Sequence, residues 1–332
     1  MNQCRFGGVL MILDLSSNVA GVHFDFPVMN ASGPRCTSSR ELFELLNSSS
    51  GGVVTKSMTS CFRSGNDSPK YYAFGDNTFN SNGLQNLGFE AYFEILRSIF
   101  RINYTYKPII ASVAVLNEQD CFEMIDNLLK SKLVDMIEVN PSCPNIEGRE
   151  ILTNNFDDLD KFVRRLMQLK TNIGSLIPIG LKLPFYTDNC HFHYVDDIVL
   201  NYGVDFVTAI NSLPYSVVVN TDSDESFIHP NSGVGGLGGP AILNLAQGQV
   251  YKHYQNLQGE VPIIGVGGVT RGVDVYNYFL CGASAVQIGS AFSVQGISIF
   301  DKIKADLEDY MKVKSVDSLK KITGKLKIPK AL

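Results

Sequence analysis

The sequence predicts an α/β fold, a (β/α)8 (TIM) barrel built by the whole chain, residues 1–332. Eight short runs rich in Val, Ile and Leu are continuous rather than alternating, as strands of a buried parallel sheet are. A helical stretch follows each run, and this order is typical of parallel strands joined by crossover helices. No low-complexity linker divides the chain, so we expect one domain. A doubly wound open sheet is the competing prediction.

The eight predicted strands are separated from the helices by loops of Gly, Ser or Asn. They cover Pro27–Asn30, Gly52–Lys56, Ile109–Val115, Met136–Asn140, Ile179–Leu183, Phe206–Ile210, Pro262–Val266 and Ala285–Ile288. Ahead of them, Leu15–Val19 and Val22–Phe26 flank Ala20-Gly21. This spacing predicts a β-hairpin, which we expect to close the floor of the barrel.

The predicted helices lie between these strands. The first begins with Ser38-x-x-Glu41, the spacing of a capping box. The predicted helices cover Ser38–Leu46, Glu90–Ile102, Gln119–Lys130, Asp157–Lys170, Phe192–Asn201, Pro240–Tyr254, Val273–Cys281 and Ser298–Val313.

Three of the strand-to-helix connections are long, at residues 57–89, 141–156 and 211–239. Loops of this length in a compact domain are usually functional. All three would lie at the C-terminal mouth of the barrel, where this fold places its active sites. Within the third loop, two apolar runs flank residues 220–225 and predict a hairpin that could act as a lid.

Composition and charge exclude several classes of protein. The chain is 45% hydrophobic and 18% charged, which indicates a globular protein, and its net charge of −5 with no long basic stretch argues against nucleic-acid binding. The seven cysteines show no C-x-x-C spacing, which favours a reducing compartment over disulfides or an iron–sulfur cluster. The apolar stretch Gly7–Leu13 is too short to span a membrane. We therefore expect a cytoplasmic protein that binds no membrane and no metal.

The residues at the ends of the predicted strands are small, amide-bearing or cationic. They are Ala31, Ser32, Gly33, Lys56, Ser57, Asn140, Lys182, Asn211, Ser212, Gly267, Gly268, Gly289 and Ser290. Such a ring suits a flat, polar ligand, and two lysines facing one cavity indicate an anionic one. The glycine pairs after the last two strands stand where barrels of this kind bind phosphate.

Cys143 lies between Pro141 and Pro144, with Asn140 and Asn145 on either side. Proline fixes its own φ and restrains the residue before it, so this loop is stiff. Cys143 is therefore either an inert buried thiol in a rigid turn or a thiol held in place to act as a base.

Motifs along the chain resemble those of the dihydroorotate dehydrogenases, in particular the fumarate-linked class 1A branch. The resemblance runs from about residue 14 to the C-terminus. It is carried by Met29–Gly33, Thr55–Ser57, Arg63-x-Gly65-Asn66, Asn80-Ser81-x-Gly83-Leu84-x-Asn86–Phe89, Asn140-x-Ser142–Asn145, Gly180–Pro184, Asn211-Ser212, Gly235–Gly239 and Cys281–Ser284.

The resemblance implies a homodimer that binds FMN and oxidises dihydroorotate to orotate in pyrimidine synthesis, passing electrons to fumarate. It implies that Cys143 removes the C5 proton while hydride leaves C6 for the flavin. Orotate would be bound by Lys56, Asn80, Gly83, Leu84, Asn140, Asn145, Asn211 and Ser212. FMN would be held by Ala31, Ser32, Gly33, Lys56, Ser57, Asn140, Lys182, Gly236, Gly267, Gly268, Gly289 and Ser290.

The chain departs from the family pattern in the residues that shape the loops. Asn82 stands where the family usually has Met, Gln85 where it has Pro, and Pro141 where it has Leu; Leu213–Ser216 and Glu147–Ile151 also differ. These departures leave two alternatives open. One is another FMN-dependent dihydropyrimidine oxidoreductase, and the other is a flavin-binding barrel without catalytic activity.

Overall fold

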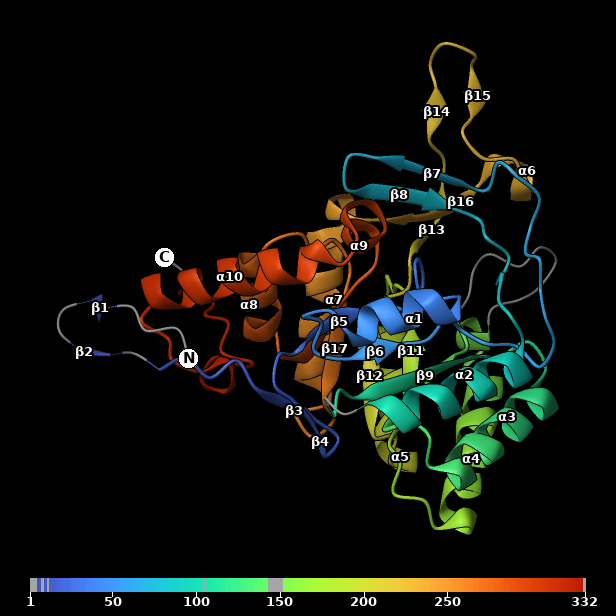
Figure 1. Cartoon of the computed structure of the whole chain (residues 1–332), viewed down its shortest axis with the longest axis horizontal. Helices are drawn as coiled ribbons and strands as arrows, with labels where there is room; N and C mark the ends of the chain where they lie inside the picture. The colour runs from blue at the N-terminus through green and yellow to red at the C-terminus, as the bar shows by residue number, and fades with distance from the viewer. Residues whose placement is uncertain (1–4, 7–8, 11, 104–105, 143–151, 331–332) are drawn as a thin grey trace.

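The computed structural model describes residues 5–6, 9–10, 12–103, 106–142 and 152–330. Its centre is an eight-stranded parallel sheet that curls into a barrel with helices packed outside it (Figure 1). The strands follow the order β5-β18-β17-β12-β11-β10-β9-β6. They are β5 (Val28–Asn30), β6 (Val53–Val54), β9 (Ile109–Ala114), β10 (Met136–Asn140), β11 (Ile179–Leu183), β12 (Phe206–Ala209), β17 (Ile263–Val266) and β18 (Ala283–Ile288). The predicted barrel and its eight strands are confirmed.

A side chain closes the seam between the two terminal strands of this sheet, β5 and β6. The buried Asn30 amide nitrogen donates to the Val54 carbonyl at 2.7 Å, and its oxygen accepts from the Val54 N–H at 2.9 Å. Nearby, the Gly51 N–H donates to the Val28 carbonyl at 2.7 Å. Because β6 has only two residues, the Asn30 amide takes the place of a backbone ladder there.

The floor of the barrel is closed by the predicted hairpin, which forms from β3 (Ser17–Val19) and β4 (Val22–Phe24). Val19 and Phe24 are buried against one layer of side chains inside the barrel. The strands contribute Met29, Val54, Ile110, Met136, Phe206, Ile264 and Ala285 to this layer. Gly180 on β11 contributes no side chain, because a Cβ there would lie 2.4 Å from the Phe206 ring. The hairpin prediction is confirmed.

The predicted helices are also confirmed, with ends that differ by at most a few residues. They are α1 (Ser39–Leu46), α2 (Phe89–Ile102), α3 (Glu118–Ser131), α4 (Phe156–Ile173), α5 (Asn189–Tyr202), α7 (Leu243–Asn256), α8 (Gly272–Leu280) and α10 (Ser298–Val313). Ser38 and Glu41 form the predicted capping box. Four short helices of the described residues were not predicted, namely α6 (Pro230–Gly233), α9 (Ser290–Gln295), η1 (Leu152–Asn154) and η3 (Leu319–Lys321), whereas η2 (Pro240–Ile242) is the first turn of the helix predicted over Pro240–Tyr254. Across the described residues, no helix combines the length and apolar character needed to cross a membrane.

A four-stranded antiparallel sheet that the sequence did not predict stands over the mouth of the barrel. Its strand order is β13-β16-β8-β7, and it joins two of the long loops. The strands are β7 (Tyr71–Phe74), β8 (Asn77–Asn80), β13 (Leu213–Ser216) and β16 (Gly235–Gly238). The glycine-rich residues Gly235–Gly238 therefore form an inner strand of this sheet, β16.

Two small hairpins complete the described structure, β1 (Arg5–Phe6) with β2 (Val9–Leu10), and β14 (Val219–Asn220) with β15 (Glu225–Ser226). The second is the hairpin predicted as a lid. It forms, but it projects away from the barrel (Figure 1), and none of residues 217–228 lines the cavity at the mouth. The lid prediction is therefore wrong.

Replacing Asn30 with alanine should open the seam between β5 and β6. The change leaves the Val54 N–H and carbonyl without these partners, so we expect the free energy of unfolding to fall by about 2–5 kcal/mol. Urea unfolding measures this loss. The control is Asn47→Ala, which removes an exposed amide from the end of α1 and should cost no more than about 0.5 kcal/mol. Equal losses in the two variants would contradict the role of Asn30.

Candidate functional site

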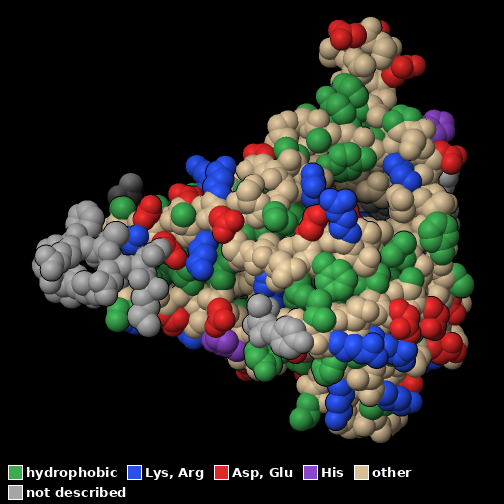
Figure 2. Space-filling view, viewed as in Figure 1, with side chains coloured by type: hydrophobic (Ala, Val, Ile, Leu, Met, Phe, Trp, Pro, Cys, Tyr) green, Lys and Arg blue, Asp and Glu red, His purple; other side chains and the backbone are tan. Residues whose placement is uncertain are grey.

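A cavity of about 550 Å³ lies at the mouth of the barrel. Its size falls in the range of small-molecule and cofactor sites. Figure 2 shows it as a hollow between the β7–β8 strands and α1, with Lys or Arg side chains at its rim. The C-terminal ends of the barrel strands converge on it, as the fold predicts.

Most of the residues predicted for the site line this one cavity. They are Ala31, Ser32, Gly33, Lys56, Ser57, Asn80, Leu84, Asn140, Lys182, Asn211, Ser212, Gly267, Gly268, Gly289 and Ser290. Gly83 and Gly236 are not among the lining residues. A Cβ on Gly83 would meet Asn66, and one on Gly236 would meet Ser212, so both glycines allow their neighbours to pack. Cys143 and Asn145 lie outside the described residues.

Two glycines after β17 allow the chain to turn tightly against α7. Gly267 and Gly268 have φ of 137° and 77°. A Cβ on Gly268 would lie 2.6–2.8 Å from three atoms of Leu243, two of them backbone atoms. These glycines therefore give a cavity wall of bare backbone, which suits a phosphate group.

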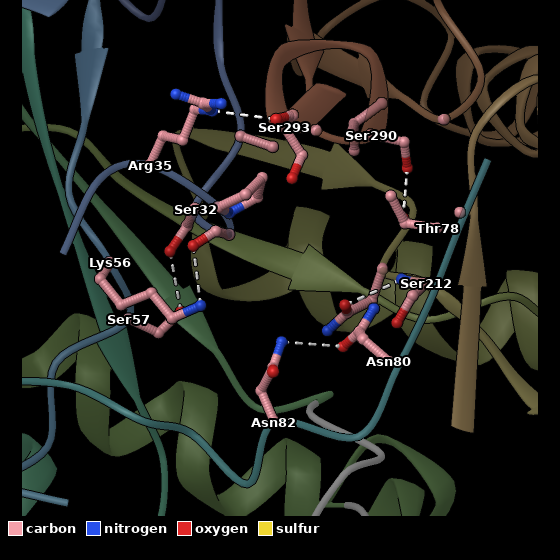
Figure 3. Close-up of a pocket in the computed structure, with 18 of the residues that line it drawn as sticks. Ser32, Arg35, Lys56, Ser57, Thr78, Asn80, Asn82, Ser212, Ser290 and Ser293 are labelled. Carbon is pink, nitrogen blue, oxygen red and sulfur yellow. Dashed lines mark hydrogen bonds between the residues drawn. The ribbon is translucent and has the colours of Figure 1, made fainter. Parts of the chain in front are cut away.

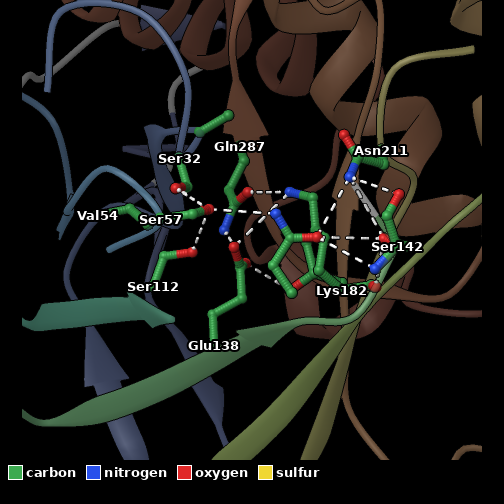
Figure 4. Close-up of polar contacts among 12 residues, drawn as sticks. Ser32, Val54, Ser57, Ser112, Glu138, Ser142, Lys182, Asn211 and Gln287 are labelled. Atoms are coloured by element: carbon green, nitrogen blue, oxygen red, sulfur yellow. Dashed lines mark hydrogen bonds and ion pairs between the residues drawn. The ribbon is translucent and has the colours of Figure 1, made fainter. Parts of the chain in front are cut away.

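A layer of buried polar side chains lies directly below the cavity. Glu138 on β10 is fully buried. One carboxylate oxygen, Oε2, accepts from Thr208 Oγ1 at 2.9 Å and from Gln287 Nε2 at 2.7 Å. The other, Oε1, has no hydrogen-bond partner among the described residues and lies 3.9 Å from the Lys182 Nζ. Lys182 Nζ donates to Gln287 Oε1 at 2.8 Å (Figure 4).

Lys182 is thus a buried cation with a buried anion behind it. Its side chain is 7% exposed, yet it reaches the cavity wall. Burial lowers the pKa of the Lys182 ammonium below its ordinary value, and the Glu138 carboxylate raises it. A lysine inside a barrel needs an anionic partner or a strong acceptor. Glu138 and Gln287 are those partners.

Hydroxyl and amide groups join the strand ends into one network. Ser57 Oγ lies 3.0 Å from Ser32 Oγ and 2.9 Å from Ser112 Oγ, and it accepts from Asn140 Nδ2 at 3.2 Å. Asn211 Nδ2 donates to Asn140 Oδ1 at 3.3 Å (Figure 4). The Asn140 amide is therefore held in one orientation at the cavity wall.

The residue just before Cys143 is part of the same network. Ser142 is buried, and its hydroxyl donates to the Lys182 carbonyl at 2.7 Å. Its N–H donates to Asn140 Oδ1 at 3.3 Å. The chain that leads to Cys143 is therefore tied to both β10 and β11 up to residue 142.

A second cation and a pair of amides face the outer part of the cavity. Lys56 Nζ donates to the Gly33 carbonyl at 2.8 Å. Asn82 Nδ2 donates to Asn80 Oδ1 at 3.3 Å. Figure 3 shows Lys56 and Ser57 on one side of the cavity and Asn80, Asn82 and Ser212 on another. This arrangement offers a cation and several amides to a planar anion.

Sequence reasoning missed two groups of residues. The first lines the cavity, and several of its members belong to the unpredicted sheet or the loops beside it: Arg35, Thr37, Glu41, Tyr71, Thr78, Asn82, Gln85 and Ser293. The second is the polar layer of Glu138, Thr208 and Gln287. Glu138 and Gln287 each stand two residues before a predicted site residue, on the same face of the strand, and this spacing could have revealed them.

The part of the chain that the structure describes holds no cluster of three His, Cys, Asp or Glu side chains able to bind a metal ion. The thiols of Cys36, Cys121 and Cys281 are buried. Burial raises the pKa of these thiols to about 11, 12 and 11, respectively.

Comparison with known proteins agrees with this geometry. Residues 14–311 match the family model described as "Dihydroorotate dehydrogenase". Among similar curated proteins are dihydroorotate dehydrogenase A (fumarate) of Lactococcus lactis subsp. cremoris, 34% identical over 94% of this chain and 99% of the relative, and dihydroorotate dehydrogenase (fumarate) of Saccharomyces cerevisiae, 32% identical over 95% and 99%. A DHODH structure from Eimeria tenella in complex with ferulenol is similar in fold, with a TM-score of 0.79 and 19% identity over 94% of this chain and 88% of that one.

Replacing Gly268 with alanine should strain the turn after β17. The added methyl group meets the Leu243 backbone at a positive φ, so we expect the free energy of unfolding to fall by about 1–3 kcal/mol. Gly289→Ala is the matched control. Its Cβ would meet only Ala31 Cβ, at 3.7 Å, so its cost should stay within about 0.5 kcal/mol. Denaturant unfolding that ranks the two variants in the opposite order would refute this account of the turn.

Proposed function

This chain belongs to the dihydroorotate dehydrogenase family, and on that premise we propose that it oxidises dihydroorotate to orotate in pyrimidine synthesis, with FMN as cofactor and fumarate as electron acceptor. The observation that carries the proposal is the cavity itself. The Lys182 ammonium, the linked amides of Asn140 and Asn211, and the glycine turn at Gly267-Gly268 all line it. These are the residues that the family resemblance assigns to cofactor and substrate.

The residues present fit FMN. Gly267 and Gly268 offer bare backbone for a phosphate, and Gly289 and Ser290 line the same cavity. Lys182 brings a buried positive charge to the cavity wall, where it suits the electron-rich edge of a flavin ring. Ser57 and Asn140 would complete the cradle for the ring. When bound, FMN supplies the acceptor for a hydride.

The outer part of the cavity fits a planar anion such as dihydroorotate. Lys56 would pair with its carboxylate, and the side chains of Asn80, Asn140, Asn211 and Ser212 would hydrogen-bond its ring amides. Asn82 and Asn211 hold Asn80 and Asn140, respectively, by hydrogen bonds. Amides fixed before the substrate arrives lose little freedom when it binds.

Cys143 is the proposed base. It takes the proton from C5 of dihydroorotate, while the two electrons leave C6 as hydride, so that a C=C bond forms between these carbons. A positioned base of this kind contributes about 10²–10⁴ in rate. The ties of Ser142 to Asn140 and Lys182 support this assignment, since they fix the chain up to the residue before the thiol.

The proposal extends to the setting in which the protein works. We place it in the cytoplasm as a homodimer of single-domain chains, acting on small molecules rather than on membranes or nucleic acids. The resemblance to the fumarate-linked class 1A branch supports this placement, and the curated relatives carry fumarate in their names.

Steady-state turnover with dihydroorotate and fumarate tests the proposed reaction. We expect orotate to form in a reaction that depends on fumarate, because the cavity offers a cation and amides to the substrate. Uracil and thymine, which lack a carboxylate for Lys56, should not be processed. A protein that reduces uracil or thymine and forms no orotate would instead be another dihydropyrimidine oxidoreductase.

Replacing Cys143 with serine tests the proposed base. Because a serine hydroxyl loses its proton far less readily than a thiol, the rate of flavin reduction by dihydroorotate should fall by about 10²–10⁴ while FMN stays bound. Stopped-flow absorbance measures both quantities. The control is Cys190→Ser, which changes an exposed thiol on α5 and should leave the rate unchanged. A flavin-binding barrel without catalytic activity would show no reduction even before mutation.

A further inference from the structure

We propose that Glu138 is a positioning residue for the flavin site, which keeps the Lys182 ammonium protonated and holds it at the cavity wall. Glu138 itself does not line the cavity, whereas Lys182 does, so the carboxylate acts through the lysine. This inference rests on the proposed function, because it concerns the lysine that we place beside FMN.

The geometry of the carboxylate carries the inference. Glu138 lies between Thr208 on β12 and Gln287 on β18, and both donate to the same oxygen, Oε2. The second oxygen, Oε1, is buried, and no residue that the structure describes forms a hydrogen bond with it; Lys182 Nζ lies 3.9 Å from it. A fully buried carboxylate oxygen without a hydrogen bond is costly unless a positive charge lies near it. Lys182 supplies that charge.

Gln287 makes the arrangement directional. Its Nε2 donates to Glu138, and its Oε1 accepts from Lys182 (Figure 4). If the amide turned over, its N–H groups would face the ammonium and its oxygen would face the carboxylate. Both contacts would then be repulsive, so the two charges fix the glutamine and the glutamine fixes the direction of the Lys182 side chain.

Among the residues that the structure describes, the groups around Lys182 leave Glu138 as its neutralising partner. Thr208 from β12 and Gln287 from β18 are uncharged, and Asn140 and Ser142 from the end of β10 are uncharged as well. Lys56 is a second cation of the cavity, and its Nζ is bound to the Gly33 carbonyl. Removing the Glu138 charge would therefore leave Lys182 buried without compensation, and its proton would be released at lower pH.

The test is the midpoint potential of bound FMN as a function of pH, measured by dithionite titration of the wild-type protein and Glu138→Gln. Glutamine keeps the shape of the side chain and an oxygen for Thr208 and Gln287, while an uncharged amide group replaces the oxygen that faces Lys182. The slope of midpoint potential against pH should change at the pH where Lys182 loses its proton. We expect this break to lie at least about one pH unit lower in E138Q than in the wild type. FMN absorbance gives cofactor content in each sample.

The two curves should also cross. At low pH, where Lys182 is protonated in both proteins, loss of the negative charge raises the potential of E138Q above that of the wild type. At higher pH only the wild type keeps its ammonium next to the flavin, so the E138Q potential falls below it. At that pH, the equilibrium constant for reduction of the flavin should be at least about tenfold lower in E138Q than in the wild type. For a two-electron reduction this lowers the midpoint potential by about 30 mV.

Thr208→Val is the matched control. It removes one hydrogen bond to Glu138 and keeps the charge, so its break should stay within about half a pH unit of the wild type. A purely structural role for the polar layer predicts similar curves for T208V and E138Q. That result, or an E138Q curve parallel to the wild type, would overturn the inference. So would a folded E138Q that holds no FMN at any pH, because Glu138 would then be needed to bind the cofactor rather than to maintain the charge of Lys182.

If E138Q does not fold, Glu138→Asp takes its place. This variant keeps a carboxylate but places it farther from Lys182, so the break in its curve should move to lower pH by less than about one unit. Its curve should still cross that of the wild type. A midpoint potential that lies below that of the wild type by the same amount at every pH would refute the inference. Dithionite reduces the flavin in place of dihydroorotate, so the result does not depend on the identity of the substrate. Wild-type protein that binds no FMN would instead contradict the proposed function.

Discussion

The buried charge of Lys182 is the constraint on which the rest of the site depends. A lysine inside a barrel is unfavourable unless its charge is balanced, and Glu138 balances it from the neighbouring strand. Gln287 and Thr208 then satisfy the carboxylate, and the Ser142 hydroxyl binds the Lys182 carbonyl. One cation thus organises side chains from β10, β11, β12 and β18 below the cavity.

The barrel is layered so that this charge is protected from water below and presented to a ligand above. The β3–β4 hairpin and a ring of apolar side chains close the floor. The polar layer of Glu138, Thr208 and Gln287 comes next, and the amides, hydroxyls and glycines of the strand ends form the mouth. Successive inward positions on a strand carry these layers, as Met136, Glu138 and Asn140 do on β10.

Much of the fold was predictable because its signals are local. Continuous apolar runs identified the strands, the spacing of Ser38 and Glu41 identified a helix start, and Ala20-Gly21 identified the floor hairpin. The sheet over the mouth was not predicted, since β8 and β16 pair over more than 150 residues of sequence and one of them is almost entirely glycine. The site followed from family motifs, but motifs do not separate residues that face a ligand from residues that support them. Gly83 and Gly236 belong to the motifs and yet do not line the cavity, whereas Glu138 supports Lys182 from within an apolar run that carries no motif.

The central claim is that the protein oxidises dihydroorotate on a flavin bound in this cavity and passes the electrons to fumarate. Its most direct test is anaerobic mixing of the purified, FMN-containing protein with dihydroorotate, followed by addition of fumarate, with flavin absorbance recorded throughout. The account predicts that dihydroorotate bleaches the flavin and that fumarate restores its colour. A flavin that stays oxidised in the presence of dihydroorotate, or a purified protein that takes up no FMN, would contradict it.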